Sequence, residues 1–198
     1  MKQSPKLPAE KRRTQLIEAA MKVISKKGYT GATTEAIAKK AGLTKGALYY
    51  HFGNKEDIFF AVVKELSGRH FSIITKPLFE ETNPEKALEL MIKNALGLVV
   101  EHKYFTLDFW NQAKRVKKIG EYLEKQHSKM EKELVSYLKK NAGMTKREGQ
   151  TVYLLLHTLF DGVVVRHQCC SSSVNLARLQ KDVIDMTKLF LHKGDKKI

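Results

Sequence analysis

At residues 33–55 the chain reads TTEAIAKKAGLTKGALYYHFGNK, and this stretch predicts two short helices joined by a glycine turn. A first helix is expected over residues 34–41, where small and apolar residues recur at the spacing of one buried stripe. Gly42 allows a sharp turn, and the hydroxyl of Thr44 can cap a second helix over residues 45–52. The pattern predicts a helix-turn-helix, which is a DNA-reading unit.

The second helix is expected to have one buried face and one face directed at the duplex. Leu48 and Phe52 are four residues apart and are predicted to point into the core. Lys45 and Tyr49 share the opposite face, with Tyr50 beside them. Aromatic residues at helical spacing usually belong to a core, but one short helix cannot bury four large side chains on one side. The outward lysine and tyrosines are therefore predicted to contact phosphates and thymine methyl groups.

The sequence resembles the tetracycline-repressor (TetR) family of bacterial transcriptional regulators from Arg12 to Val63, without a gap. The segments that carry this resemblance are RRTQLIEAA, GYTGATTEAIAKKAG and LTKGALYYHFGNKEDIF. It implies an all-α protein, with an N-terminal three-helix helix-turn-helix head and a C-terminal helical body for ligand binding and dimerisation. The pattern and the resemblance together assign the following residues to DNA: Thr33, Thr34, Thr44, Lys45, Gly46, Tyr49, Tyr50, His51 and Lys55.

Composition and charge agree with a DNA-binding head. The chain has 198 residues, 42% of them hydrophobic and 29% charged, which predicts a globular protein with a core and a small second unit. The net charge is +15, and residues 1–55 hold ten lysines and two arginines against three glutamates. Such an excess also suits RNA or an anionic membrane, so the motif decides for DNA. We expect a DNA-binding domain at 1–55 and an effector-binding and dimerisation domain at 56–198.

The lack of a recognisable targeting signal and the small number of cysteines both favour the cytoplasm. No apolar run approaches the roughly 20 residues that cross a bilayer, and the N-terminal residues lack the apolar region of a signal peptide. Cys169 and Cys170 are adjacent, so a disulfide between them would be strained. A metal or oxidant-sensing site formed with His167 is the weaker alternative to two ordinary thiols. We expect a cytoplasmic protein without a membrane partner.

Outside the helix-turn-helix, every long segment has the periodicity of an amphipathic helix. Caps, prolines and glycines set the expected limits. Thr33 or Thr34 is expected to cap the helix over 34–41, and Asn54 is expected to cap the helix from Lys55. The predicted helices run from Pro8 to just before Gly28, from Lys55 toward Ile74 with an interruption at Pro77, from Pro84 to His102, over 117–141 with an end at Gly143, from the Thr145 and Glu148 capping box to His167, and over 174–192.

The last two helices are more apolar than a helix with one buried side requires. Either they are central in a monomer, or a second chain covers them, and the resemblance implies a four-helix bundle across a two-fold axis. We therefore expect a homodimer whose two heads read an inverted repeat in double-stranded DNA. The predicted interface comprises Tyr153, Leu156, Leu159, Phe160, Val163, Val164, Val183, Met186 and Phe190.

The middle helices suggest a ligand site, although most apolar residues of this kind are simply core. Asp108, His127 and His157 are the candidate polar contacts, and an ordinary surface aspartate is the competing interpretation of Asp108. The candidate apolar wall comprises Phe71, Ile74, Met91, Ala95, Leu98, Phe105, Phe109, Trp110, Met130 and Tyr137.

Motifs of catalysis are missing from the sequence. It has no nucleophile elbow, glycine-rich phosphate loop, HExxH or CxxC motif, so we expect no enzyme, no catalytic residue, no cofactor and no resident metal. The sequence predicts a sequence-specific transcriptional regulator, a repressor released from its operator by a small apolar or amphipathic effector of unknown identity. The alternative is a DNA-binding protein of the same fold whose body responds to a protein partner.

Overall fold

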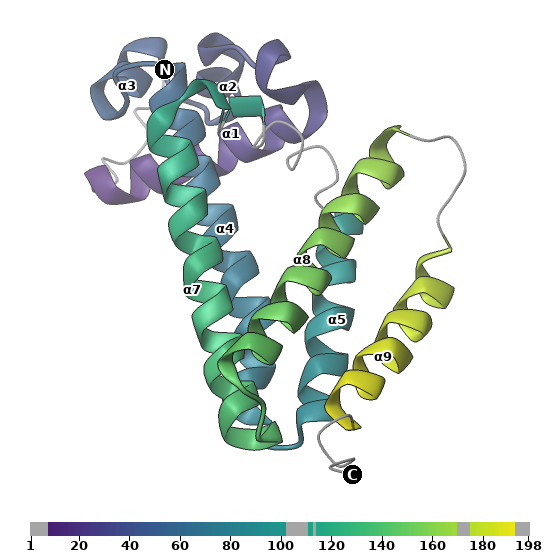
Figure 1. The fold of residues 1–198 in the computed structure, drawn as a ribbon. Helices are drawn as coiled ribbons and strands as arrows, with labels where there is room; N and C mark the ends of the chain where they lie inside the picture. Colours follow the sequence, from purple (N-terminus) through teal and green to yellow (C-terminus); the bar gives the residue numbers. More distant parts are fainter. Residues whose placement is uncertain (1–7, 102–110, 113, 170–174, 193–198) are drawn as a thin grey trace.

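The computed structural model describes residues 8–101, 111, 112, 114–169 and 175–192, and in this part of the chain every regular element is a helix. Figure 1 shows a head made of the first three helices above a body of longer ones. The labelled helices are α1 (Ala9–Gly31), α2 (Thr34–Lys40), α3 (Lys45–His51), α4 (Lys55–Glu80), α5 (Pro84–Glu101), α7 (Lys117–Ala142), α8 (Lys146–Cys169) and α9 (Leu176–His192). The predicted all-α class is confirmed.

Side-chain caps begin the helices of the head where the sequence predicts them. Thr33, Thr44 and Asn54 each accept a hydrogen bond from the backbone N–H three residues later, at 3.1, 3.1 and 2.8 Å. Gly42 makes the turn between α2 and α3 with φ +67°, a conformation that glycine adopts without the steric cost of a side chain. Gly28, at φ 69°, interrupts the helical backbone of α1, and one more turn follows it.

The predicted interruption of α4 at Pro77 is wrong, because the helix continues to Glu80. Proline lacks the N–H that would bond to the carbonyl four residues earlier. That carbonyl belongs to Ile73, and it accepts a hydrogen bond of 2.9 Å from the side-chain amide of Asn94 on α5. Since Pro77 is also buried, tertiary contacts replace the lost local bond.

Two apolar cores stabilise the molecule, one in the head and one in the body. The head core joins residues of α1, α2 and α3 to the first half of α4 as far as Leu66, and it includes Ile119 of α7. The body core joins α5, α7, α8 and α9, with Leu78 of α4 at its edge. Fully buried side chains such as Phe59 and Leu138 anchor the two cores. Burial of this apolar surface is the main stabilising contribution in each part.

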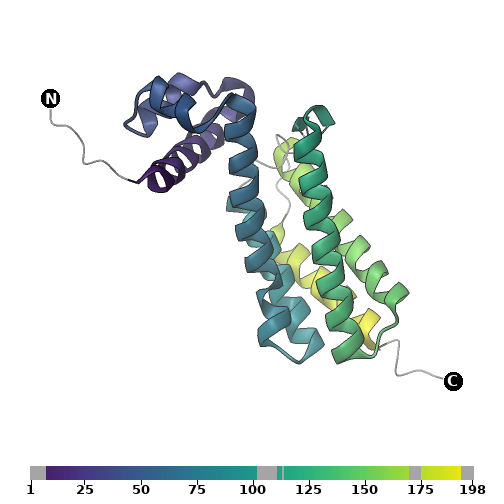
Figure 2. The same cartoon turned by 90° about the vertical axis from the view of Figure 1, so that its left-hand side faces the viewer.

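The long helices α4 and α7 connect these cores. Figures 1 and 2 show both of them descending side by side from the head into the body. At the head end, Ile119 is fully buried and Lys118 pairs with Asp57 near the start of α4. The hydroxyl of Tyr122 also donates to the backbone carbonyl of Lys64, at 3.4 Å. Nothing in the sequence pattern of α7 indicates this contact with the head.

Within the described residues, the helices fall short of the length and apolar character needed to span a bilayer.

Candidate functional site

The helix α3 presents its outward face as the sequence predicts. Leu48 is fully buried, whereas Tyr49 is 44% and Tyr50 is 81% exposed. A methyl group added at Gly46 would meet only the Thr44 hydroxyl, 3.9 Å away, so the backbone there is open to an approaching molecule. The ring of His51 packs edge-on against that of Tyr50, with 5.1 Å between centroids. The outward face of α3 is therefore aromatic and exposed.

Side chains of α2 and α3 form a polar cluster on this side of the head. Lys45 forms an ion pair with Glu35, a residue that the sequence analysis did not single out. The Lys45 ammonium also lies 5.8 Å from the centre of the Tyr49 ring. The Tyr49 hydroxyl is 3.4 Å from that of Thr34, which is itself nearly buried. The hydrogen bond between the Lys45 ammonium and the Glu35 carboxylate lowers the pKa of Glu35 and raises that of Lys45, so both groups are charged around neutral pH.

A hollow of about 390 Å³ lies between the start of α2 and the start of α4. Thr33, Thr34, Tyr49 and Lys55 line it, so four of the predicted DNA residues surround one space. The Lys55 ammonium is 3.3 Å from the Thr30 carbonyl oxygen and 4.4 Å from the centre of a tyrosine ring. These contacts hold the lysine at the rim of the hollow. The hydroxyls of Thr33 and Thr44 cap helices, so both residues have a structural role in the head.

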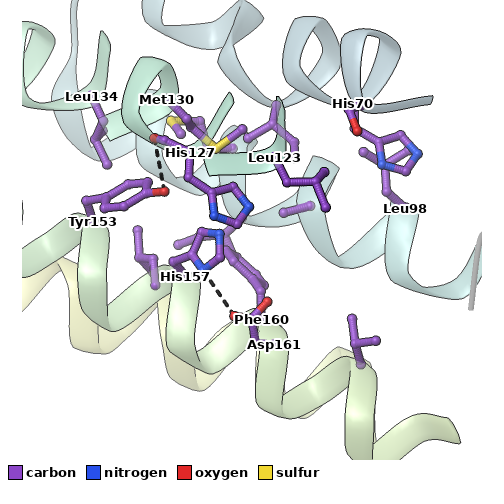
Figure 3. Close-up of a pocket in the computed structure, with 17 residues that line it drawn as sticks. His70, Leu98, Leu123, His127, Met130, Leu134, Tyr153, His157, Phe160 and Asp161 are labelled. Carbon is purple, nitrogen blue, oxygen red and sulfur yellow. Dashed lines mark hydrogen bonds and ion pairs between the residues drawn. The ribbon is translucent and has the colours of Figure 1, made fainter. Parts of the chain in front are cut away.

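The body contains a cavity of about 230 Å³. Figure 3 shows its lining side chains converging from several helices. Its wall is mostly apolar, and its polar groups lie chiefly on α7 and α8. The lining residues are Ser67, His70 and Ile74 of α4, Met91, Ile92, Ala95 and Leu98 of α5, Leu123, His127, Met130 and Leu134 of α7, and Tyr153, Leu156, His157, Phe160, Asp161 and Val164 of α8.

A cluster of two histidines, a tyrosine and an aspartate forms the polar side of this cavity (Figure 3). The imidazoles of His127 and His157 stack edge-on with 4.4 Å between centroids. His157 Nδ1 lies 3.1 Å from a carboxylate oxygen of Asp161, and the Tyr153 hydroxyl donates to the His127 carbonyl at 3.2 Å. Desolvation and then the neighbouring His157 lower the pKa of His127, so its imidazole is neutral at pH 7. Desolvation, followed by the Glu131 and Asp161 carboxylates, raises the pKa of Tyr153 to about 12.

The predicted ligand residues fall into three groups. Those that line the cavity are Ile74, Met91, Ala95, Leu98, His127, Met130 and His157. Phe71 and Tyr137 are elsewhere: a lysine ammonium lies 4.3 Å from the Phe71 ring, and the Tyr137 hydroxyl donates to the Glu81 carbonyl at 2.8 Å. Phe105, Asp108, Phe109 and Trp110 lie outside the described residues. The sequence analysis missed Asp161, although its spacing of four from His157 places both on one helix face.

Several residues predicted at a dimer interface instead face the interior of their own chain. Tyr153, Leu156, Phe160 and Val164 line the cavity, and Val163 and Val183 are buried in the body core. Leu159 and Phe190 are only partly buried, and Met186 is 36% exposed. The reason is that α8 carries two apolar stripes, and packing alone decides which one turns inward. The outward apolar residues of α8 and α9 are Leu154, Leu155, Val165, Met186 and Leu189.

The side chains of His167, Cys169 and Cys170 lie outside the described part of the structure. In the part that is described, no group of three or more histidine, cysteine, aspartate or glutamate residues is arranged to hold a metal ion.

Comparison with known proteins matches residues 16–62 to the family model described as bacterial regulatory proteins, tetR family. The fatty acid metabolism regulator protein of Bacillus subtilis is 34% identical over 85 residues, which cover 43% of this chain and 44% of that protein. The HTH-type transcriptional regulator BetI of Vibrio vulnificus is 27% identical over 171 residues, which cover 83% of this chain and 84% of that protein. The chain thus spans less than half the length of the first relative and most of the second.

Among solved structures, the regulator FadR of Bacillus subtilis in complex with stearoyl-CoA has the same fold. The TM-score is 0.70 at 21% identity, over 87% of this chain and 96% of that chain. The TM-score shows a shared arrangement of helices, and at this low identity the likeness concerns the fold alone.

Proposed function

Because the chain belongs to the tetR family of bacterial regulatory proteins, we propose that it is a sequence-specific DNA-binding repressor released from its operator by a small apolar or amphipathic ligand. Members of this family are transcriptional regulators rather than enzymes. The observation that carries the proposal is the body cavity, since two helices lead from it into the core of the DNA-binding head.

DNA binding is assigned to residues 1–55 and effector binding with dimerisation to residues 56–198. The exposed Tyr50, the Lys45 cluster and the hollow beside Lys55 support the first assignment. Lysines and the amides of helix starts bind phosphate oxygens, whereas side chains on the outward face of α3 reach base edges in the major groove. The head is then expected to dock α3 in the major groove and the start of α4 against the phosphate backbone.

A homodimer is proposed through α8 and α9. Leu154 and Leu189 are 63% and 69% exposed in the single chain, and three further large apolar residues on these helices are also exposed. Exposed apolar surface is a common mark of a protein interface. Two heads related by a two-fold axis would read an inverted repeat, with half-sites about one helical turn or a multiple apart.

Coupling between ligand and DNA is proposed to run through α4 and α7. On α4, twelve residues separate Lys55 at the head from Ser67 at the cavity, which at 1.5 Å per residue is about 18 Å of helix. On α7, Ile119 is buried in the head core and His127 lines the cavity. A ligand that prefers one separation of these helices would shift the head orientation and hence the affinity for DNA.

The presence of the body cavity bears on whether a small molecule or a protein partner regulates the chain. A solid body would favour a protein partner, whereas a mostly apolar space with a few convergent polar groups is typical of a small-molecule site. FadR of Bacillus subtilis, solved with stearoyl-CoA, is a protein of this fold that accommodates a ligand with a long apolar chain. We therefore favour a small molecule over a protein partner.

The proposal is tested by filling the cavity. Ala95 is 6% exposed and lines the cavity, so Ala95→Phe should occupy the space while leaving the head intact. DNA selected by the purified protein would supply the operator, and a thermal-shift screen would supply ligands. The Ala95→Phe protein should bind operator normally and ignore the ligand. The control Ser136→Phe, at an exposed position of α7 outside the cavity lining and the proposed interface, should respond as the unmodified protein does. An unchanged ligand response in a folded Ala95→Phe protein would place the effector elsewhere.

A further inference from the structure

The charge balance of the cavity differs from that of the chain. The sequence holds 36 lysines and arginines against 21 aspartates and glutamates. Yet none of the described residues that line the cavity is a lysine or an arginine, and their carboxylate comes from Asp161. In so basic a protein, the described part of the cavity wall has one carboxylate and neither lysine nor arginine, which favours a positively charged ligand.

Asp161 is placed to act as a counter-ion. Its side chain is 41% exposed, and one of its oxygens lies 3.1 Å from His157 Nδ1. An ionised carboxylate has about four lone-pair sites on its two oxygens, so it can accept a second donor while keeping the histidine. Figure 3 shows this aspartate and His157 together at the polar side of the cavity, with His127 facing them.

Aromatic side chains line the same side of the cavity. Phe160 precedes Asp161 on α8, and Tyr153 and the two stacked imidazoles complete the polar side. Desolvation, followed by the carboxylates of Glu131 and Asp161, raises the pKa of Tyr153, so its phenol is neutral. Neutral aromatic rings attract cations through their electron-rich faces. The Asp161 carboxylate and the aromatic rings therefore both favour a positively charged ligand.

An anionic head group would be unfavourable in this cavity. It would lie near the Asp161 carboxylate, without a lysine or arginine among the described lining residues to balance it. Above pH 7 imidazoles are ordinarily neutral, and the pKa of His127 is lowered further. Burying an unpaired charge in a mostly apolar space is unfavourable, so a carboxylate head is disfavoured.

We propose that the cavity binds an amphiphilic amine, which is an apolar chain or ring system carrying one protonated nitrogen that pairs with Asp161. This inference rests on the proposed function, in which a ligand releases the protein from DNA. The apolar part fills the space between α4, α5 and α7, where Met91, Leu98 and Met130 form the wall. The nitrogen lies at the α8 side, between the carboxylate and the aromatic rings.

Three probes with the same ten-carbon chain test the ligand class: decylamine, 1-decanol and decanoate, each below its micelle concentration. At pH 8 an alkylamine is protonated, a fatty carboxylate is ionised and histidines are ordinarily neutral, so the probes share a chain length and carry a positive, a neutral and a negative head group. Calorimetric titration of the full chain should give the tightest binding for decylamine, about tenfold tighter than decanol, with decanoate weakest. Tighter binding of decanoate or decanol would overturn the proposal.

Variants of the aspartate locate the effect. In Asp161→Asn the preference for decylamine over decanol should disappear, and in Asp161→Glu it should persist. The matched control is Asp182→Asn, because Asp182 is exposed on α9 and pairs with Arg178 outside the cavity. Thermal unfolding checks that each variant is folded. A preference that survives in folded Asp161→Asn would contradict the assignment of the counter-ion.

The outcomes also separate this inference from the proposed function. If decanoate or decanol binds best and releases operator DNA, ligand-controlled repression stands and the amine class is wrong. If no probe binds, the amine proposal fails, while the cavity-filling Ala95→Phe variant still decides whether the effector acts from this space.

Discussion

Replacing Glu35 by glutamine should strengthen DNA binding, because this residue holds a lysine of the DNA-facing surface. Lys45 and Glu35 form an ion pair whose side chains are 53% and 58% exposed. At that exposure the pair contributes little to the stability of the fold. Its expected effect is on charge: in the proposed docking the Glu35 carboxylate lies beside the duplex, and Lys45 must leave it to reach a phosphate. Glu35→Gln removes the carboxylate and frees the lysine.

The magnitude follows from counterion release. Each additional phosphate neutralised makes the slope of log K against log salt steeper by about 0.9. One freed lysine therefore predicts a slope change of about −0.9, which amounts to about eightfold tighter binding at 0.1 M salt relative to the 1 M reference. The gain should appear for operator and unrelated DNA alike, because phosphates carry no sequence information.

The assay is fluorescence anisotropy of labelled duplexes over a series of salt concentrations. Glu124→Gln is the matched control, since it makes the same charge change at an exposed position of α7 in the body and should leave the slope unchanged. An unaltered slope in Glu35→Gln, or weaker binding to every duplex, would refute the idea that Glu35 restrains Lys45. Weaker binding to the operator alone would instead make Glu35 a base-reading residue.

Three further changes have defined outcomes. Lys55→Ala should weaken binding to all duplexes and make the same slope shallower by about 0.9, because the lysine at the rim of the head hollow would no longer reach a phosphate; an unchanged slope counts against this docking. Leu189→Glu should leave the chain folded but shift it from dimer to monomer in sedimentation, since this leucine is 69% exposed; a persistent dimer would place the interface elsewhere. The lowered pKa of His127 means that the unfolded chain binds a proton more readily, so the free energy of unfolding should fall as pH drops below about 6.5, until the folded-state pKa is reached. Denaturant titrations of His127→Gln should show a flatter pH dependence, and an identical one would exclude this histidine as the cause.

Local chemistry explains which parts of the fold the sequence could predict. The caps at Thr33, Thr44 and Asn54 and the turn at Gly42 depend on neighbours within three residues, and they are found as expected. The extension of α4 through Pro77 was not predictable in this way. It depends on a side chain of α5 that lies far along the sequence and supplies the missing hydrogen bond.

The lining of the body cavity also could not be predicted from local sequence. Periodicity identifies α8 as apolar on more than one face, but packing decides which face turns inward. Residues such as Leu156 and Phe160 were therefore predicted at a dimer interface and in fact line the cavity. The contact of α7 with the head is also tertiary: Ile119 looks like any helical isoleucine in the sequence, and only the fold buries it beside α4.

The central claim is that the body cavity and the DNA-binding head are thermodynamically coupled. The most direct measurement is the affinity of one cavity-binding small molecule, found by thermal shift and lost in Ala95→Phe, determined with and without saturating operator DNA. A coupling free energy of about 1–3 kcal/mol predicts that operator weakens the ligand by roughly five- to 150-fold, and that the ligand weakens operator binding by the same factor. A ligand that occupies the cavity with the same affinity whether or not DNA is bound would contradict the account.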